Sequence, residues 1–192
     1  MTLRTFIAVE IDAAVRQAAD GLIDALRGPP ADVKWVEFQN RHITLQFLGD
    51  VAEEATGQIG AAIAQVATAA APFELHVCGA GAFPSPGRPR TLWLGCEKGV
   101  AQLTDLQQRI EAALARLGYR PESRRFQAHL TIGRVRGGGP ALAELGRLLR
   151  EHAEFDAGRT EVRQVTLFSS QLGPQGPKYT PLGVAELQGA GK

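Results

Sequence analysis

The sequence predicts an α+β fold in which a β-α-β-α-β unit occurs twice, with antiparallel pairing in its sheets. Three observations predict it: a strand-like segment that recurs, amphipathic helices that follow each copy, and a His-x-Thr triplet at the same place in each half. The strand segments alternate apolar and polar residues, which favours antiparallel pairing over buried parallel strands. The 192 residues suffice for one domain, or for two small lobes that share a cleft.

Each half follows the same order of elements. Arg4-Thr-Phe-Ile-Ala-Val in the first half reappears as Arg90-Thr-Leu-Trp-Leu-Gly in the second, and both read as short apolar strands. Helical spacing of apolar residues predicts helices over 13–26, 53–69, 100–117 and 141–152, and closing strands are expected at 73–78 and 161–169. The turn-rich linker 79–90 separates repeats of about 1–83 and 88–182.

A His-x-Thr triplet lies in a predicted strand of each half, at His42 and at His129. The interval from Thr5 to His42 is 37 residues and that from Thr91 to His129 is 38, so the triplets occupy equivalent places. Side chains alternate between the two faces of a strand, which predicts a polar face and a core face for each triplet. The expected polar faces are His42, Thr44 and Gln46, and His129 with Thr131; the expected core faces are Ile43, Leu45 and Phe47, and Leu130 with Ile132.

An imidazole beside a hydroxyl on each of two strands suits the cleavage of a phosphodiester. The unperturbed pKa of histidine is near 6.5, so one neutral imidazole can take a proton from the nucleophile while a protonated one gives a proton to the leaving oxygen. The hydroxyls can donate to the non-bridging phosphate oxygens, where negative charge must be stabilised. One triplet alone is typical of a structural histidine, but the duplicated pair favours a shared site.

Neither triplet has the neighbours of a metal site, since a catalytic zinc ion usually takes three protein ligands at characteristic spacings. His76 alternates with core residues and is expected to face solvent, and His152 is expected at the C-terminal end of a helix. Cys78 and Cys96 also lack metal-ligand spacing and are expected to be reduced, structural thiols. We therefore expect no cofactor and no metal.

The net charge of +1 excludes a strong overall attraction for nucleic acid. The basic residues are nonetheless unevenly placed: there are 17 Arg against 4 Lys, and the segment from Arg116 to Arg136 holds six arginines against one glutamate. No apolar stretch is long enough to cross a bilayer, and the first residues lack the order of a secretion signal. We expect a cytoplasmic monomer that does not bind membranes.

The paired motifs resemble the two-histidine (2H) phosphoesterases, and more narrowly the RNA 2′,3′-cyclic phosphodiesterases, historically called 2′-5′ RNA ligases. The most specific segments are His42-Ile-Thr-Leu-Gln-Phe-Leu-Gly49 and His129-Leu-Thr-Ile-Gly-Arg134. The supporting segments are Arg4-Thr-Phe-Ile-Ala-Val, Lys34-Trp-Val, Gly81-Ala-Phe-Pro84, Arg90-Thr-Leu-Trp93, Val165-Thr-Leu-Phe-Ser-Ser170 and Tyr179. One departure is Ala128, which precedes the second histidine where the family often has proline.

The resemblance implies one bilobal catalytic domain over residues 1–192, with both termini in one lobe and the middle of the chain in the other. It implies a metal-independent enzyme that hydrolyses the 2′,3′-cyclic phosphate end of RNA to a 2′-phosphate. His42 would be the proton donor to the leaving 3′ oxygen, and His129 would be the proton acceptor that activates water. Thr44, Thr131 and Arg134 would bind the phosphate.

Arg134 is the site residue whose position is least expected. Its odd spacing from His129 places it on the opposite face of a regular strand. We expect it to reach the phosphate through a bend near Gly133, or else to lie at the rim of the site.

Three other activities stay open. Reversal of the same chemistry would join a cyclic phosphate to a 5′-hydroxyl, as a 2′-5′ RNA ligase does. A relative acting on a small cyclic nucleotide would use the same histidines, although the arginine cluster favours RNA, whose additional phosphates would bind the extra guanidiniums. A non-catalytic RNA-binding module could stack bases on Trp35 or Trp93 but needs no paired histidines.

Overall fold

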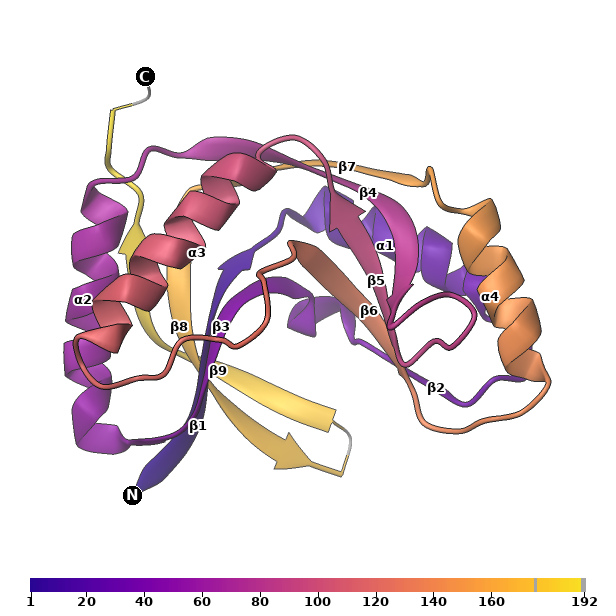
Figure 1. The fold of residues 1–192 in the computed structure, drawn as a ribbon, viewed down its shortest axis with the longest axis horizontal. Helices are drawn as coiled ribbons and strands as arrows, with labels where there is room; N and C mark the ends of the chain where they lie inside the picture. The colour runs from indigo at the N-terminus through magenta and orange to yellow at the C-terminus, as the bar shows by residue number, and fades with distance from the viewer. Residues whose placement is uncertain (175, 191–192) are drawn as a thin grey trace.

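Neither half of the sequence forms a lobe by itself. In the computed structural model, which describes residues 1–174 and 176–190, the chain forms two antiparallel sheets that face each other (Figure 1). The first sheet has the order β3-β1-β8-β9, with β1 (Thr2–Glu10), β3 (His42–Ala52), β8 (Gln164–Gly173) and β9 (Gly176–Glu186). The second has the order β2-β6-β5-β4-β7, with β2 (Val33–Trp35), β4 (Phe73–Phe83), β5 (Thr91–Cys96), β6 (His129–Val135) and β7 (Asp156–Val162).

The helices cover the outer faces of the sheets, and two of them cover the sheet that does not contain the strand before them (Figure 1). Helix α1 (Ala13–Leu26) follows β1 but packs on β7 of the second sheet, where α4 (Ala141–Glu151) packs on β4. Helices α2 (Thr56–Thr68) and α3 (Val100–Ala115) contact each other and cover the first sheet. Through this exchange, residues of both sheets and of the helices share one hydrophobic core.

The α+β class and the antiparallel sheets are confirmed, and the helix bounds agree with the prediction to within three residues. Two strand predictions need correction. The strand expected at 73–78 continues to Phe83, so its last residues lie in the segment expected as a linker. The closing strand expected at 161–169 is two strands, β7 and β8, separated at Arg163.

Strand β9 has no counterpart among the predicted elements. It contains Pro177, Pro181 and Gly183, residues that read as turns in a sequence. Strand β9 is an edge strand that pairs with β8 alone. One of its sides needs no hydrogen-bond donors, so proline, which lacks a backbone N–H, is tolerated there. No helix within 1–174 and 176–190 is both long and apolar enough to cross a bilayer.

Candidate active site

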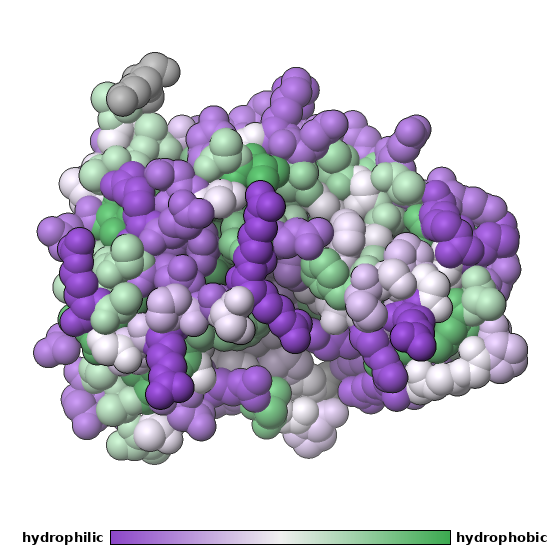
Figure 2. Space-filling view, in the orientation of Figure 1, coloured by the Kyte–Doolittle hydropathy of each residue, from purple (hydrophilic) through white to green (hydrophobic). Residues whose placement is uncertain are grey.

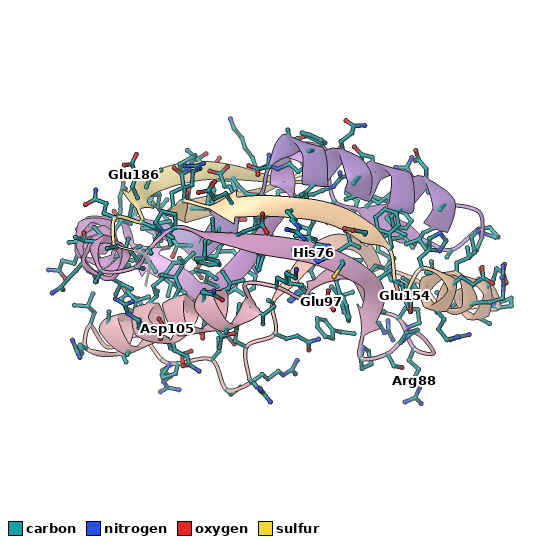
Figure 3. The ribbon with its side chains drawn as sticks, turned by 90° about the horizontal axis from the view of Figure 1, so that it is seen from above. His76, Arg88, Glu97, Asp105, Glu154 and Glu186 are labelled. Atoms are coloured by element: carbon teal, nitrogen blue, oxygen red, sulfur yellow. The ribbon has the colours of Figure 1, made fainter. Side chains whose placement is uncertain are left out.

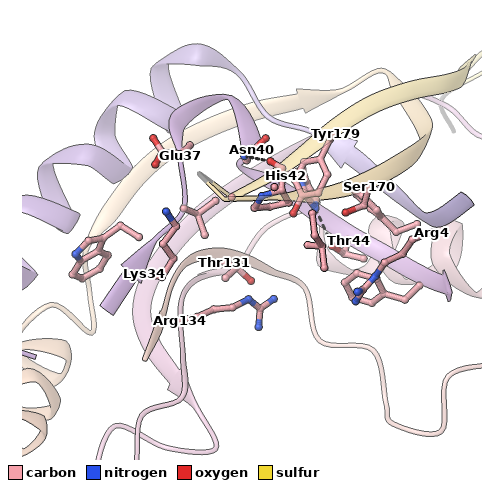
Figure 4. Close-up of a pocket in the computed structure, with 18 of the residues that line it drawn as sticks. Arg4, Lys34, Glu37, Asn40, His42, Thr44, Thr131, Arg134, Ser170 and Tyr179 are labelled. Carbon is pink, nitrogen blue, oxygen red and sulfur yellow. Dashed lines mark hydrogen bonds between the residues drawn. The ribbon is translucent and has the colours of Figure 1, made fainter. Parts of the chain in front are cut away.

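The two His-x-Thr strands belong to different sheets, and their polar faces meet in one cleft. A cavity of about 700 Å³ is lined by His42, Thr44, Thr131 and Arg134, and an adjoining cavity of about 660 Å³ shares the last three and adds His129. Figure 4 shows His42 and Thr44 on one side of the first cavity, with Thr131 and Arg134 on the other. All five predicted site residues are therefore brought together.

A β-bulge directly after the second triplet explains how Arg134 reaches the cleft. In the pairing of β5 with β6, Trp93 lies opposite Thr131 and Leu92 lies opposite Gly133, so Ile132 is an extra residue. The extra residue reverses the alternation. Gly133 is consequently buried, and Arg134 is exposed on the same side as Thr131. The bend expected near Gly133 is present.

The first triplet is followed by a bulge at the equivalent place. Because of it, the predicted orientations of Gln46 and Phe47 were wrong. In the pairing of β1 with β3, Ile7 lies opposite Gln46 and Ala8 opposite Thr44, so Leu45 is the extra residue. Gln46, expected beside the histidine, is only 2% exposed. Phe47, expected in the core, is 55% exposed and lines both cavities.

His42 lies in an aromatic environment and its ring is hydrogen-bonded at both ends. Its Nε2 is 3.1 Å from the Thr44 hydroxyl oxygen, and the backbone of Asn40 accepts a hydrogen bond from the ring. The imidazole stacks on Phe6 at 4.8 Å between ring centroids and meets the Tyr179 ring edge-on at 5.3 Å. Burial therefore lowers the pKa of His42 to about 4, although the hydrogen bond to Asn40 opposes the shift.

His129 has a corresponding environment in the second lobe. Its Nδ1 lies 2.7 Å from the carbonyl oxygen of Gln127, so Nδ1 carries the proton and Nε2 keeps a free lone pair. The ring meets Phe83 edge-on at 5.0 Å between centroids. Burial lowers the pKa of His129, and the positive charge of Arg134 adds to this effect.

Basic side chains outnumber acidic ones around the cleft. Figure 2 shows strongly hydrophilic side chains crossing the face between the lobes. Of the arginine cluster, Arg116 and Arg120 do not line the two cavities, while the other four do. The basic lining residues are Arg4, Lys34, Arg90, Arg124, Arg125, Arg134 and Arg136, and the acidic ones are Glu37 and Glu122. The cleft is therefore suited to a polyanion.

Comparison with known proteins agrees with this geometry. A family model described as the 2′-5′ RNA ligase superfamily matches residues 12–174. The chain belongs to that superfamily. A member named RNA 2′,3′-cyclic phosphodiesterase, from Methanothermobacter thermautotrophicus, is 37% identical over 188 residues, 97% of this chain and 100% of the relative. Another of the same name, from Archaeoglobus fulgidus, is 39% identical over 184 residues, 96% of this chain and 100% of the relative.

Solved structures of other proteins share the fold. The crystal structure of TT0787 of Thermus thermophilus aligns with a TM-score of 0.82 at 27% identity, covering 97% of this chain and 98% of that one. Escherichia coli LigT complexed with 3′-AMP aligns with a TM-score of 0.77 at 25% identity, covering 97% and 99%. The resemblance seen in the sequence is confirmed.

The two histidines outside the motifs, His152 and His76, differ in how far the structure agrees with the prediction. His152 directly follows α4 as predicted, with Nδ1 at 2.9 Å from the Leu148 carbonyl oxygen. His76 was expected to face solvent, but its side chain is only 15% exposed, because Glu97 and Asp156 pack on either side of the ring. Cys78 and Cys96 form no disulfide within the described part of the chain.

Proposed function

We propose that this protein is an RNA 2′,3′-cyclic phosphodiesterase, which hydrolyses the cyclic phosphate end to a 2′-phosphomonoester by acid–base catalysis of His42 and His129. The observation that carries the proposal is the meeting of two His–Thr pairs, one from each sheet, in a single basic cleft. The relatives that bear this name and match over their full length support it.

The threonines and Arg134 bind the phosphate in this proposal. The hydroxyls of Thr44 and Thr131 face the cleft from opposite lobes and can donate to different non-bridging oxygens. The Arg134 guanidinium supplies charge-assisted hydrogen bonds. Because negative charge on these oxygens grows as the fifth bond to phosphorus forms, the same contacts stabilise the transition state more than the substrate.

Two proton transfers complete the reaction. Nε2 of His129 takes a proton from water as the water oxygen bonds to phosphorus, and His42 gives a proton to the 3′ oxygen as its bond to phosphorus breaks. The hydrogen bond from His129 Nδ1 to Gln127 supports the role of proton acceptor, since it directs the free lone pair away from the backbone. With a 5′-hydroxyl in place of water, the same two transfers would give 2′-5′ ligation: His129 would take the proton of the 5′-hydroxyl and His42 would protonate the leaving 3′ oxygen.

The depressed pKa of His42 fits a proton donor only when the substrate is bound. In the free cleft, burial among Phe6, Tyr179 and Phe168 disfavours the imidazolium. The negative charge of a bound phosphodiester favours it. The substrate therefore brings His42 to the protonated state that the reaction needs.

We extend the proposal to the substrate and the setting. The cationic lining on both sides of the motif residues favours RNA over a small cyclic nucleotide, because only a longer chain has phosphates for it. The protein is expected to act as a cytoplasmic monomer.

The product identifies the activity. An oligonucleotide with a 2′,3′-cyclic phosphate is incubated with the protein in EDTA, and the end group is followed by ³¹P NMR. We expect a 2′-phosphomonoester. A 3′-phosphomonoester, or no reaction until a divalent metal is supplied, would contradict the proposal.

A sulfur substitution separates the roles of the histidines. In a cyclic end whose 3′ bridging oxygen is replaced by sulfur, the leaving thiolate needs no proton. We expect the His42→Ala variant to recover activity on this substrate relative to the oxygen substrate, and His129→Ala to remain impaired. Recovery by His129→Ala instead would reverse the assignment.

A further inference from the structure

A second group of reactive side chains lies outside the motif residues, on β4 and the ends of its neighbours. His76 and Cys78 are two residues apart in β4 and therefore share a face, opposite the buried Leu75 and Val77. Glu97, just past β5, is held beside them because its N–H donates to the His76 carbonyl at 3.0 Å. His76 and Glu97 lie next to each other in Figure 3.

The three side chains are close enough together to act as ligands of one metal ion. One ligand atom from each of His76, Cys78 and Glu97 lies within 4.8 Å of the others. Glu97 Oε2 is 3.5 Å from His76 Nδ1 and 3.9 Å from Cys78 Sγ. A tetrahedral zinc ion, with bonds of about 2.0–2.3 Å, sets such atoms roughly 3.3–3.6 Å apart. The two distances from Glu97 are close to these values, and the separation of the His76 and Cys78 ligand atoms, at most 4.8 Å, would have to shorten by up to about 1.5 Å through rotation of the side chains.

Asp156 orients the histidine for this role. Its Oδ1 lies 2.8 Å from His76 Nε2 and also accepts the N–H of Gly158 at 2.7 Å, so the carboxylate is anchored. A proton on Nε2 leaves the lone pair on Nδ1, facing Glu97. Within 1–174 and 176–190 this Nδ1 is buried without a hydrogen-bond partner. A carboxylate that fixes the outer nitrogen of a metal-bound histidine is a recurring feature of zinc sites.

The ligand chemistry selects the metal. We propose that His76, Cys78 and Glu97 bind Zn²⁺, with a water molecule in the fourth position and Asp156 holding the imidazole. A thiol and an imidazole favour Zn²⁺ over Mg²⁺ or Ca²⁺, which prefer oxygen.

The site would stabilise the second sheet next to the catalytic cleft without taking part in the reaction. Cys78 pairs with Gly95, and Gly95 pairs with His129, so one row of the sheet connects Cys78 to the motif histidine across two strand spacings, roughly 10 Å. A metal ion here would join β4 to the connection between β5 and α3. Hydrolysis in EDTA would persist, while the resistance of the sheet to unfolding would fall.

Cobalt substitution tests the proposal without any RNA. The metal-free, reduced protein is titrated with Co²⁺, and absorption from sulfur-to-cobalt charge transfer is recorded. We expect one Co²⁺ per chain, displacement by Zn²⁺, and loss of the band in Cys78→Ser and His76→Gln. Asp156→Asn should weaken binding by about 10–100-fold. Cys96→Ser is the matched control and should leave the band intact, because Cys96 is not a member of the group of three ligands.

Thermal unfolding gives a second readout that does not depend on the spectrum. At a free Zn²⁺ concentration of 100 Kd, the wild-type melting temperature should rise by roughly 5–10 °C, and that of Cys78→Ser should not. A His42→Ala, His129→Ala double variant should retain the effect, which excludes binding at the catalytic pair. A band that survives Cys78→Ser, or a zinc effect equal in wild type and His76→Gln, would overturn the proposal, whatever the outcome of the hydrolysis assay.

Discussion

Phe47 and Arg134 occupy equivalent positions in the two halves of the chain, each five residues after a motif histidine and each turned into the same cleft by a bulge. The two halves of the sequence are alike at this position in their spacing and their bulge, but the side chains that they place in the cleft differ. One lobe presents an aromatic ring at this position and the other a guanidinium. We interpret this difference as the feature that fixes the orientation of the RNA in the cleft, with a base near Phe47 and a phosphate near Arg134.

Removal of the Arg134 guanidinium should reduce the stabilisation of the transition state. We expect Arg134→Gln to lower kcat/KM for a cyclic-ended oligonucleotide by about 10–100-fold, since a hydrogen bond to a charged group contributes about 1.5–3 kcal/mol. Steady-state kinetics measures this. Arg116→Gln, at an arginine that ends α3 away from the two cavities, is the control and should change kcat/KM by less than about twofold.

Removal of the aromatic ring should act mainly on binding. We expect Phe47→Ala to raise KM for RNA by about 5–100-fold, with a smaller change in kcat, because base stacking on an aromatic side chain contributes about 1–3 kcal/mol. Leu117→Ala, at an exposed apolar residue after α3, should leave KM unchanged. If KM is the same for both variants and wild type, Phe47 does not contact the base.

The triplets and their shared cleft were predictable from the sequence, but the orientation of the residues after them was not. Strand alternation is a reliable guide only while the pairing is regular, and Leu45 and Ile132 look like ordinary strand residues. Because each bulge depends on the neighbouring strand, no local signal marks it. The family pattern placed Arg134 in the site, whereas strand periodicity alone placed Phe47 in the core.

The zinc ligands and β9 escaped prediction for a related reason. His76 and Cys78 are close in sequence, but Glu97 joins them only through the pairing of β4 with β5, so no ligand spacing could be read. Strand β9 carries prolines that only an edge position tolerates. Helices, by contrast, were located from their apolar spacing alone, since that pattern is local.

The pKa of His42 makes stability depend on pH. Between pH 6.5 and about 4, the unfolded state binds a proton at this position and the folded state does not, so the free energy of unfolding falls as the pH falls. The loss from this group amounts to at most about 3 kcal/mol. Urea unfolding at pH 7 and pH 4 should show a smaller loss for His42→Asn than for wild type. Equal losses would mean that His42 titrates normally in the folded protein.

Arg41, directly before the first triplet, should be important for stability. Its side chain is 3% exposed, donates to the Arg16 carbonyl at 2.6 Å and to the Val36 carbonyl at 3.2 Å, and pairs with Asp20. We expect Arg41→Ala to reduce the free energy of unfolding by about 3 kcal/mol, since buried acceptors lose their donors. Arg27→Ala, at an exposed ion pair, should cost less than about 1 kcal/mol, and equal losses in urea unfolding would contradict the account.

The central claim is that His42 and His129 act together as the acid and the base. Its most direct test is the single-turnover rate of hydrolysis of a 2′,3′-cyclic-ended oligonucleotide in EDTA, for wild type, His42→Ala, His129→Ala and the double variant. We expect each single variant to lose at least about 100-fold, and the double variant to lose far less than the product of the two. Wild-type activity in either single variant, or loss of wild-type activity through EDTA alone, would contradict the claim.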